Sequence, residues 1–82
     1  MNCTNLINVV IGPKVNQVYK TFKNCISLQT LTILNNTKMI NYSETLLGAN
    51  SNVNIYVPSN LLNDYLNSEW ANHGTIIGQE WN

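Results

Sequence analysis

The chain has 82 residues, of which 44% are hydrophobic and only 10% are charged, enough for one small core with an almost uncharged surface. Its four basic and four acidic side chains cancel, which argues against a nucleic-acid partner or an anionic membrane surface. No apolar run approaches the roughly 20 residues of a membrane span, and the first residues lack the basic start and apolar stretch of a signal peptide.

The first two predicted strands end two copies of one sequence phrase. NCTNLINVVI fills residues 2–11 and NCISLQTLTI fills residues 24–33, and both follow the pattern N-C-x-x-L-x-x-apolar-x-I. Apolar residues at every second position toward the end of each copy predict a short strand with one face turned inward. Neither copy has enough partners to bury its own apolar face, so we expect the copies to stack.

A third predicted strand lies in ANSNVNIYVP, residues 49–58, where Ile55 and Val57 continue the positions of Leu31 and Ile33. A period of 20 to 29 residues with this apolar spacing is typical of leucine-rich repeats. The three copies therefore predict three neighbouring strands whose inward side chains form one continuous core.

The segments between the strands must turn and return beneath the core. Gly12-Pro13 and Asn35-Asn36 are turn-forming pairs, and asparagine, at 16 positions in the chain, suits such turns. The apolar residues of the return segments have irregular spacing, which predicts extended or 3₁₀ pieces: Val15, Val18 and Phe22 in the first segment, and Met39, Ile40, Leu46 and Leu47 in the second.

A helix is predicted after the third strand, over about residues 60–72. Pro58 ends the strand because it has no N–H to donate, and Ser59 or Asn60 suits a helix N-cap. Gly74 suits a terminator. An apolar stripe at helical spacing predicts that the helix covers the last open edge of the stack: Leu61, Leu62, Tyr65, Leu66 and Trp70.

Two stretches resemble the BspA-type bacterial leucine-rich repeat. FKNCISLQTLTI at residues 22–33 is similar to the repeat unit F-x-N-C-x-S-L-x-x-I-x-I-P, and residues 55–77 are similar to a closing unit of such proteins. That unit reads I-Y-V-P, then a short helix, a Trp and a final strand-like Ile. The chain departs from the family after Ile33, where the usual I-G-x-x-A-F run is missing, and it starts inside a repeat without an N-terminal cap.

Together these observations predict an α/β repeat fold, namely a short leucine-rich-repeat solenoid of about three coils with a C-terminal capping helix. We expect a single domain over residues 1–82, with coils at about 2–23, 24–48 and 49–58.

The two cysteines raise the possibility of a disulfide or a metal site. Cys3 and Cys25 occupy equivalent positions of adjacent copies, so they are expected about 5 Å apart. That spacing permits a disulfide, but the repeat pattern favours a ladder of buried thiols. Zinc needs about four ligands, and only His73 remains to help.

No local motif predicts catalysis. A nucleophile and base drawn from either cysteine and His73 lack a supporting pattern, and His73 is better placed to cap helix carbonyls or face solvent. The acidic residues share no motif either: Glu44, Asp64, Glu69 and Glu80. We therefore predict no catalytic, cofactor-binding or metal-binding residues, no cofactor, and a protein that is not an enzyme.

The outward face of the predicted sheet is the candidate interaction surface, because a solenoid usually binds its ligands on such a row of side chains. Tyr19, Tyr42 and Trp81 are further candidates for exposed contacts, although single exposed aromatic residues are common. The candidate residues of the surface are Asn8, Val9, Val10, Thr30, Thr32 and Tyr56.

The first strand is expected to leave one edge of the sheet open. Residues 1–11 contain no charged side chain, so nothing in the sequence blunts this edge against pairing. We expect another protein, or a second copy of the chain, to dock there, the alternative being that residues 1–5 fold back as a partial cap.

The resemblance implies binding or assembly, since BspA-type repeats with this closing unit occur in bacteriophage structural proteins and in adhesins of bacteria and some protists. We favour a small structural or host-attachment component of a phage particle, located in the virion. The alternative is the C-terminal fragment of a cell-surface adhesin. Neither reading involves nucleic acid or membrane insertion.

Overall fold

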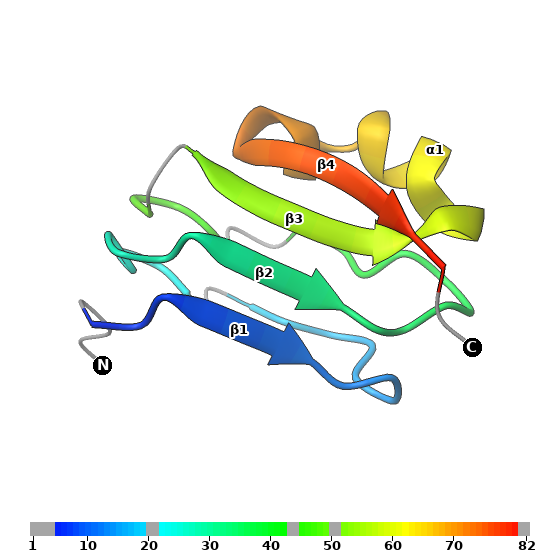
Figure 1. Cartoon of the computed structure of the whole chain (residues 1–82), viewed down its shortest axis with the longest axis horizontal. Coiled ribbons are helices and arrows are strands. Elements are labelled where there is room, and N and C mark those ends of the chain that lie inside the picture. The colour runs from blue at the N-terminus through cyan, green and yellow to red at the C-terminus, as the bar shows by residue number, and fades with distance from the viewer. Residues whose placement is uncertain (1–4, 20–21, 43–44, 50–51, 81–82) are drawn as a thin grey trace.

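Four parallel strands form one sheet in the computed structural model, which describes residues 5–19, 22–42, 45–49 and 52–80. The strands lie side by side in chain order (Figure 1). Their bounds are β1 Asn8–Ile11, β2 Thr30–Ile33, β3 Val53–Pro58 and β4 Gly74–Gln79.

The register of the first three strands is the one that the repeated phrase predicts. Leu31 pairs with Val9 on one side and with Ile55 on the other, and Ile76 of β4 extends this inward row. Leu31 and Ile55 are fully buried. A second row, which faces outward, joins Val10, Thr32, Tyr56 and Ile77 across the four strands.

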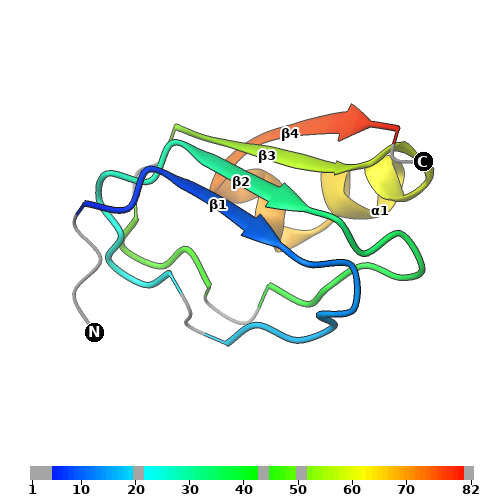
Figure 2. The ribbon, with the colours of Figure 1, turned by 60° about the horizontal axis from the view of Figure 1, so that its bottom comes forward.

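The connections between strands form a second layer against the inward face of the sheet (Figure 2). The first two return segments bond to each other, because the N–H groups of Phe22 and Asn24 donate to the carbonyls of Thr45 and Leu47 over 3.1 and 2.9 Å. The apolar core lies between the two layers. Its buried members are Ile11, Val18, Phe22, Cys25, Leu28, Leu31, Ile33, Ile40, Tyr42, Leu46, Val53, Ile55, Val57, Leu61, Tyr65 and Trp70.

The turn predicted at Asn35-Asn36 is organised by a buried asparagine. The Asn35 side chain donates to the Val15 carbonyl over 2.9 Å, and its oxygen accepts from the Thr37 N–H over 2.9 Å. An asparagine oxygen bonded two residues ahead is an Asx turn. Asn35 is only 3% exposed, so its side chain needs these partners. The bond to Val15 joins the two return segments, and the bond from Thr37 shapes the turn.

The helix predicted over about 60–72 is broken into three short pieces. A 3₁₀ turn at Ser59–Leu61 leads into α1, Leu62–Leu66, and a second 3₁₀ turn covers Glu69–Asn72. Between them the Ser68 hydroxyl donates to the Tyr65 carbonyl over 2.6 Å, a local bond that competes with continued helix. The apolar stripe is still used, since Leu61, Tyr65 and Trp70 are buried.

The predicted leucine-rich-repeat solenoid of about three coils with a C-terminal capping helix is wrong. The described part of the chain is a compact domain of 32 × 22 × 19 Å with a four-stranded parallel sheet and one short α-helix. The three return paths are not equivalent coils: the first is irregular, the second is organised by Asn35, and the third is helical. The helical pieces connect two parallel strands, so they do not close the end of a stack.

β4 occupies the edge that the helix was expected to cover. It pairs with β3 from Val53 with Gly74 to Pro58 with Gln79. Gly74, expected to end the helix, instead begins this strand, and a Cβ there would lie 2.3 Å from the Val53 carbonyl oxygen. Only glycine permits this approach of the two backbones.

Two aromatic side chains hold the backbone of Ile40 inside the core. The Tyr65 hydroxyl accepts from the Ile40 N–H over 3.0 Å, and the Trp70 indole donates to the Ile40 carbonyl over 2.7 Å. Burial raises the pKa of Tyr65, the hydrogen bond from Ile40 lowers it to a smaller extent, and the charge of Asp64 raises it further. Trp70 also meets Tyr42 edge-on, with ring centres 5.1 Å apart.

Two left-handed residues lie before the second and third strands. Asn24 has a φ of 63° and Gly48 a φ of 76°. The two residues are also in contact, since a Cβ on Gly48 would lie 2.1 Å from the Asn24 side-chain oxygen. Position 48 therefore needs glycine for its backbone angle and for its space.

We expect Gly48→Ala to lower the free energy of unfolding by about 1–3 kcal/mol, because a residue with a Cβ is strained at this φ. Gly12→Ala is the matched control: Gly12 lies outside the left-handed region, and a Cβ there would meet no atom within 4 Å. We expect the control to change stability by no more than about 0.5 kcal/mol. Urea unfolding measures both, and equal effects would contradict the assignment of strain to position 48.

We expect Tyr65→Phe to destabilise the fold by about 1–3 kcal/mol at neutral pH, because it leaves the buried Ile40 N–H without its acceptor. Tyr56→Phe, on the outward face, should leave the urea midpoint unchanged.

The same variant tests the raised pKa of Tyr65. The folded state favours the neutral phenol, so its contribution is complete below the ordinary tyrosine pKa near 10 and is lost as pH rises through the higher folded pKa. Stability of the unmodified protein should therefore fall above about pH 10, and Tyr65→Phe should show a smaller fall. An equally steep alkaline fall in the variant would contradict this role.

Candidate interaction site

The outward face of the sheet carries all but one of the residues predicted to form an interaction surface. One row across the strands begins with Asn8, Thr30 and Asn54, and the neighbouring row begins with Val10, Thr32 and Tyr56. Both rows are uncharged. Val9 is the exception, because it belongs to the inward row and packs against the core.

The outer edge of β1 has no strand beside it in the described part of the chain. The carbonyl of Ile7 accepts from Gln29 and Thr30, over 2.8 and 3.1 Å, and the carbonyl of Ile11 accepts from Leu34 over 3.0 Å. Because backbone groups alternate sides along a strand, those of Asn8 and Val10 point away from β2. These groups are available to hydrogen-bond another strand.

Apolar side chains accompany this edge. Val10 is 64% exposed, and Ile7, which directly precedes β1, is 46% exposed. No charged side chain occurs from residue 5 to residue 11. The edge therefore lacks the charge that usually protects an edge strand from pairing.

The opposite edge is less open. The helical pieces Ser59–Leu61, α1 and Glu69–Asn72 all contact β4, and Figure 1 shows α1 next to the end of this strand. A Cβ on Gly78 would lie 3.0 Å from a Leu62 methyl, which shows how closely α1 approaches β4. Of the two edge strands, β1 is the more accessible.

The described residues contain no group of three or more His, Cys, Asp and Glu side chains that could hold a metal ion. His73 lies 3.6 Å from the Glu69 carboxylate and stacks on the Tyr42 ring, with centres 4.4 Å apart. Tyr42, which the sequence placed among the exposed aromatic residues, is buried. These contacts hold the last 3₁₀ turn against the second return segment. Neither Glu69 nor Tyr42 is one of the cysteines that were considered as a nucleophile for His73.

Cys25 is fully buried and disulfide-bonded. The predicted thiol ladder is therefore wrong for this residue. The chain has one other cysteine, Cys3, which lies outside the described residues. A domain of this size gains only limited stability from its core. A disulfide adds to that stability.

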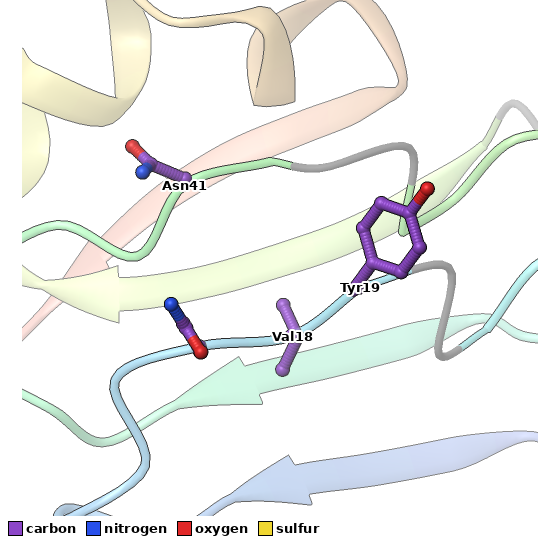
Figure 3. A pocket seen from close by; sticks show the side chains of 4 residues that line it. Val18, Tyr19 and Asn41 are labelled. Carbon is purple, nitrogen blue, oxygen red and sulfur yellow. The ribbon is translucent and has the colours of Figure 1, made fainter.

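A hollow of about 350 Å³ opens in the return layer (Figure 3). Gln17, Val18 and Tyr19 line it from the first return segment, and Asn41 lines it from the second. Tyr19 is 68% exposed, whereas Val18 is 9% exposed and belongs to the core. The sequence indicated Tyr19 as an exposed aromatic residue but gave no reason to place Gln17 and Asn41 beside it. Trp81, the third such aromatic, lies outside the described residues.

Comparison with known proteins gives no match to a protein-family model, to a curated protein or to a solved structure. Within the described ranges, no helix has the length and apolar character needed to cross a membrane.

We expect a reductant to lower the melting temperature of the protein, because loss of a disulfide from a small domain costs about 2–5 kcal/mol. Cys25→Ser should melt at a lower temperature than the unmodified protein and should no longer respond to reductant. Thermal melts with and without reductant, together with thiol titration of the unfolded chain, measure both effects. Two free thiols before reduction, with a melt that reductant leaves unchanged, would contradict the disulfide.

Proposed function

We propose that the protein is a non-enzymatic protein-binding and assembly module that docks through the free edge of β1 and the outward side chains next to it. The observation that carries this proposal is the edge itself: the backbone groups of Asn8 and Val10 point away from the sheet, and Val10 is 64% exposed without a charged neighbour from residue 5 to residue 11. A partner strand would satisfy these groups and cover the apolar side chains.

The partner is another protein or a second copy of the chain. The edge carries no charge, so it favours a partner of similar neutral character, and pairing of backbone groups needs little side-chain specificity. The sequence also allowed residues 1–5 to fold back as a partial cap on this edge. Residues 1–4 lie outside the described part of the chain, so this alternative stays a prediction.

The proposed setting is a bacteriophage particle, where the protein serves as a small structural or host-attachment component in the virion. This choice is supported by the sequence similarity of residues 22–33 and 55–77 to BspA-type units, a similarity that does not extend to a repeat fold. The alternative is the C-terminal fragment of a cell-surface adhesin. A buried disulfide supports exposure outside the reducing cytoplasm, which both settings provide.

We expect Val10→Lys and Asn8→Pro each to weaken docking by about tenfold or more. The lysine adds a charge to the edge, and the proline removes an N–H that points away from β2. Thr75→Lys is the matched control, since it places the same charge on the exposed side of β4. Light scattering over a range of protein concentrations measures self-association, and unchanged thermal melts show that the variants fold.

The outcomes separate the possible partners. Loss of association in both β1 variants but not in Thr75→Lys indicates two copies paired through β1. Loss in all three indicates that β1 of one copy pairs with β4 of the next. If the protein is monomeric at every concentration, its partner is a different protein. In that case purified particles must contain the chain in a fixed ratio to their other proteins. Association that persists in both β1 variants would overturn docking through this edge.

A further inference from the structure

The hollow in the return layer has a composition that suits one class of ligand. Among the described residues, those that line it are two primary amides, one aromatic ring and one aliphatic side chain, and none of these four is charged. Gln17, Tyr19 and Asn41 are exposed, and buried Val18 lies between two of them in the chain. Figure 3 shows the Tyr19 ring at one end of the group and Asn41 at the opposite end, on the neighbouring segment.

The amides match a ligand that offers several hydroxyl groups. Each primary amide has two N–H donors and an acceptor oxygen, so Gln17 and Asn41 together present donors and acceptors from two different return segments. A hydroxyl both donates and accepts, so adjacent hydroxyls on a sugar ring can bond to the two ends of one amide. A charged ligand would find no opposite charge on Gln17, Val18, Tyr19 or Asn41, the lining side chains that the structure describes.

The Tyr19 ring supplies the apolar half of the same recognition. The face of an aromatic ring is electron-rich, and the C–H groups on one face of a sugar ring carry a small positive charge. The two faces therefore attract each other and exclude water from between them. The volume of about 350 Å³ lies at the small end of ligand sites, with space for roughly one or two sugar rings.

We propose that this hollow is a binding site for a neutral carbohydrate, with the Tyr19 ring stacked on the sugar and the amides of Gln17 and Asn41 bonded to its hydroxyls. The site is independent of docking through β1, because it belongs to the return layer and uses none of the residues of the outward face. Its ligand is a neutral glycan, and one site should bind a short saccharide with a Kd in the millimolar range because the site is small and open.

The test is a titration of the isotope-labelled chain with maltose, lactose and N,N′-diacetylchitobiose, followed by NMR. We expect at least one of these neutral probes, at up to about 50 mM, to shift the side-chain amide signals of Gln17 and Asn41 and the ring signals of Tyr19. Glucuronic acid, at the same ionic strength, should shift them less.

Variants decide whether the shifts report this site. Tyr19→Ala should weaken binding by about tenfold, whereas Tyr19→Phe should retain most of it, since stacking needs the ring and not the hydroxyl. Gln17→Ala and Asn41→Ala should weaken binding, and Gln29→Ala, which removes an exposed amide elsewhere, should not. Because Gln17, Asn41 and Gln29 are exposed, their alanine variants should keep the melting temperature of the unmodified protein, and a thermal melt of each Tyr19 variant shows that it still folds.

Three results would overturn the proposal. The first is that no neutral probe shifts these signals over the full titration. The second is that Tyr19→Ala binds the probes as well as the unmodified protein does, which places the sugar elsewhere. The third is that the anionic probe binds more tightly than the neutral ones, which requires a cation that the four described lining residues do not supply.

Discussion

The fold depends on the way the backbone of Ile40 is satisfied inside the core. Both of its polar atoms lie away from water, and both are bonded by aromatic side chains, Tyr65 and Trp70, from the C-terminal third of the chain. An unpaired buried N–H or carbonyl would cost more than an ordinary hydrogen bond contributes. The second return segment and the helical pieces are therefore fixed to each other, and the chain leaves Trp70 in position to begin β4 beside β3.

This arrangement decides which edge of the sheet remains accessible. Because β4 follows the helical pieces directly, those pieces stay in contact with it and cover part of its surroundings. β1 lies at the other end of the strand order, whereas the helical pieces pack against β3 and β4. The asymmetry between the two edges follows from where the aromatic side chains lie in the chain, because they draw the C-terminal segment beneath the sheet.

The sequence predicted the features that depend on short-range patterns. The repeated phrase predicted three strands and their register, and the alternation of apolar residues predicted that Thr32 and Tyr56 share the outward face. It misplaced Val9, which was grouped with the interaction surface although its alternation with Val10 points it inward. The stripe that included Tyr65 and Trp70 predicted correctly that these side chains would be buried, but not that the helix would break after Leu66.

The fold class failed because it depended on contacts that no local pattern carries. β4 contains two glycines, Gly74 and Gly78, which weaken a strand prediction. The structure needs Gly74, because a Cβ there would meet the Val53 carbonyl oxygen. The hollow was missed for a related reason: Gln17 and Asn41 come to line one hollow only when the first two return segments pack together. Propensity alone treats a glycine as a residue that ends a strand and an asparagine or glutamine as an ordinary surface residue. The role of Gly74, Gln17 and Asn41 comes instead from the segment that packs against each of them.

The two proposed surfaces lie in different layers, and this determines how they would work together. A strand added at β1 extends the sheet in its own plane at a spacing of about 4.8 Å, so it leaves the return layer uncovered. Copies held together in a particle would then each keep the hollow of Gln17, Tyr19 and Asn41 open to the surroundings. Several weak sites held at fixed distances raise the effective concentration for a repeated ligand, and avidity can exceed the affinity of one site by about 10²–10⁴. In the proposed attachment role, a millimolar carbohydrate site on a single copy would be too weak to hold a particle on a cell, whereas an assembled array of such sites would meet that need without any further contact.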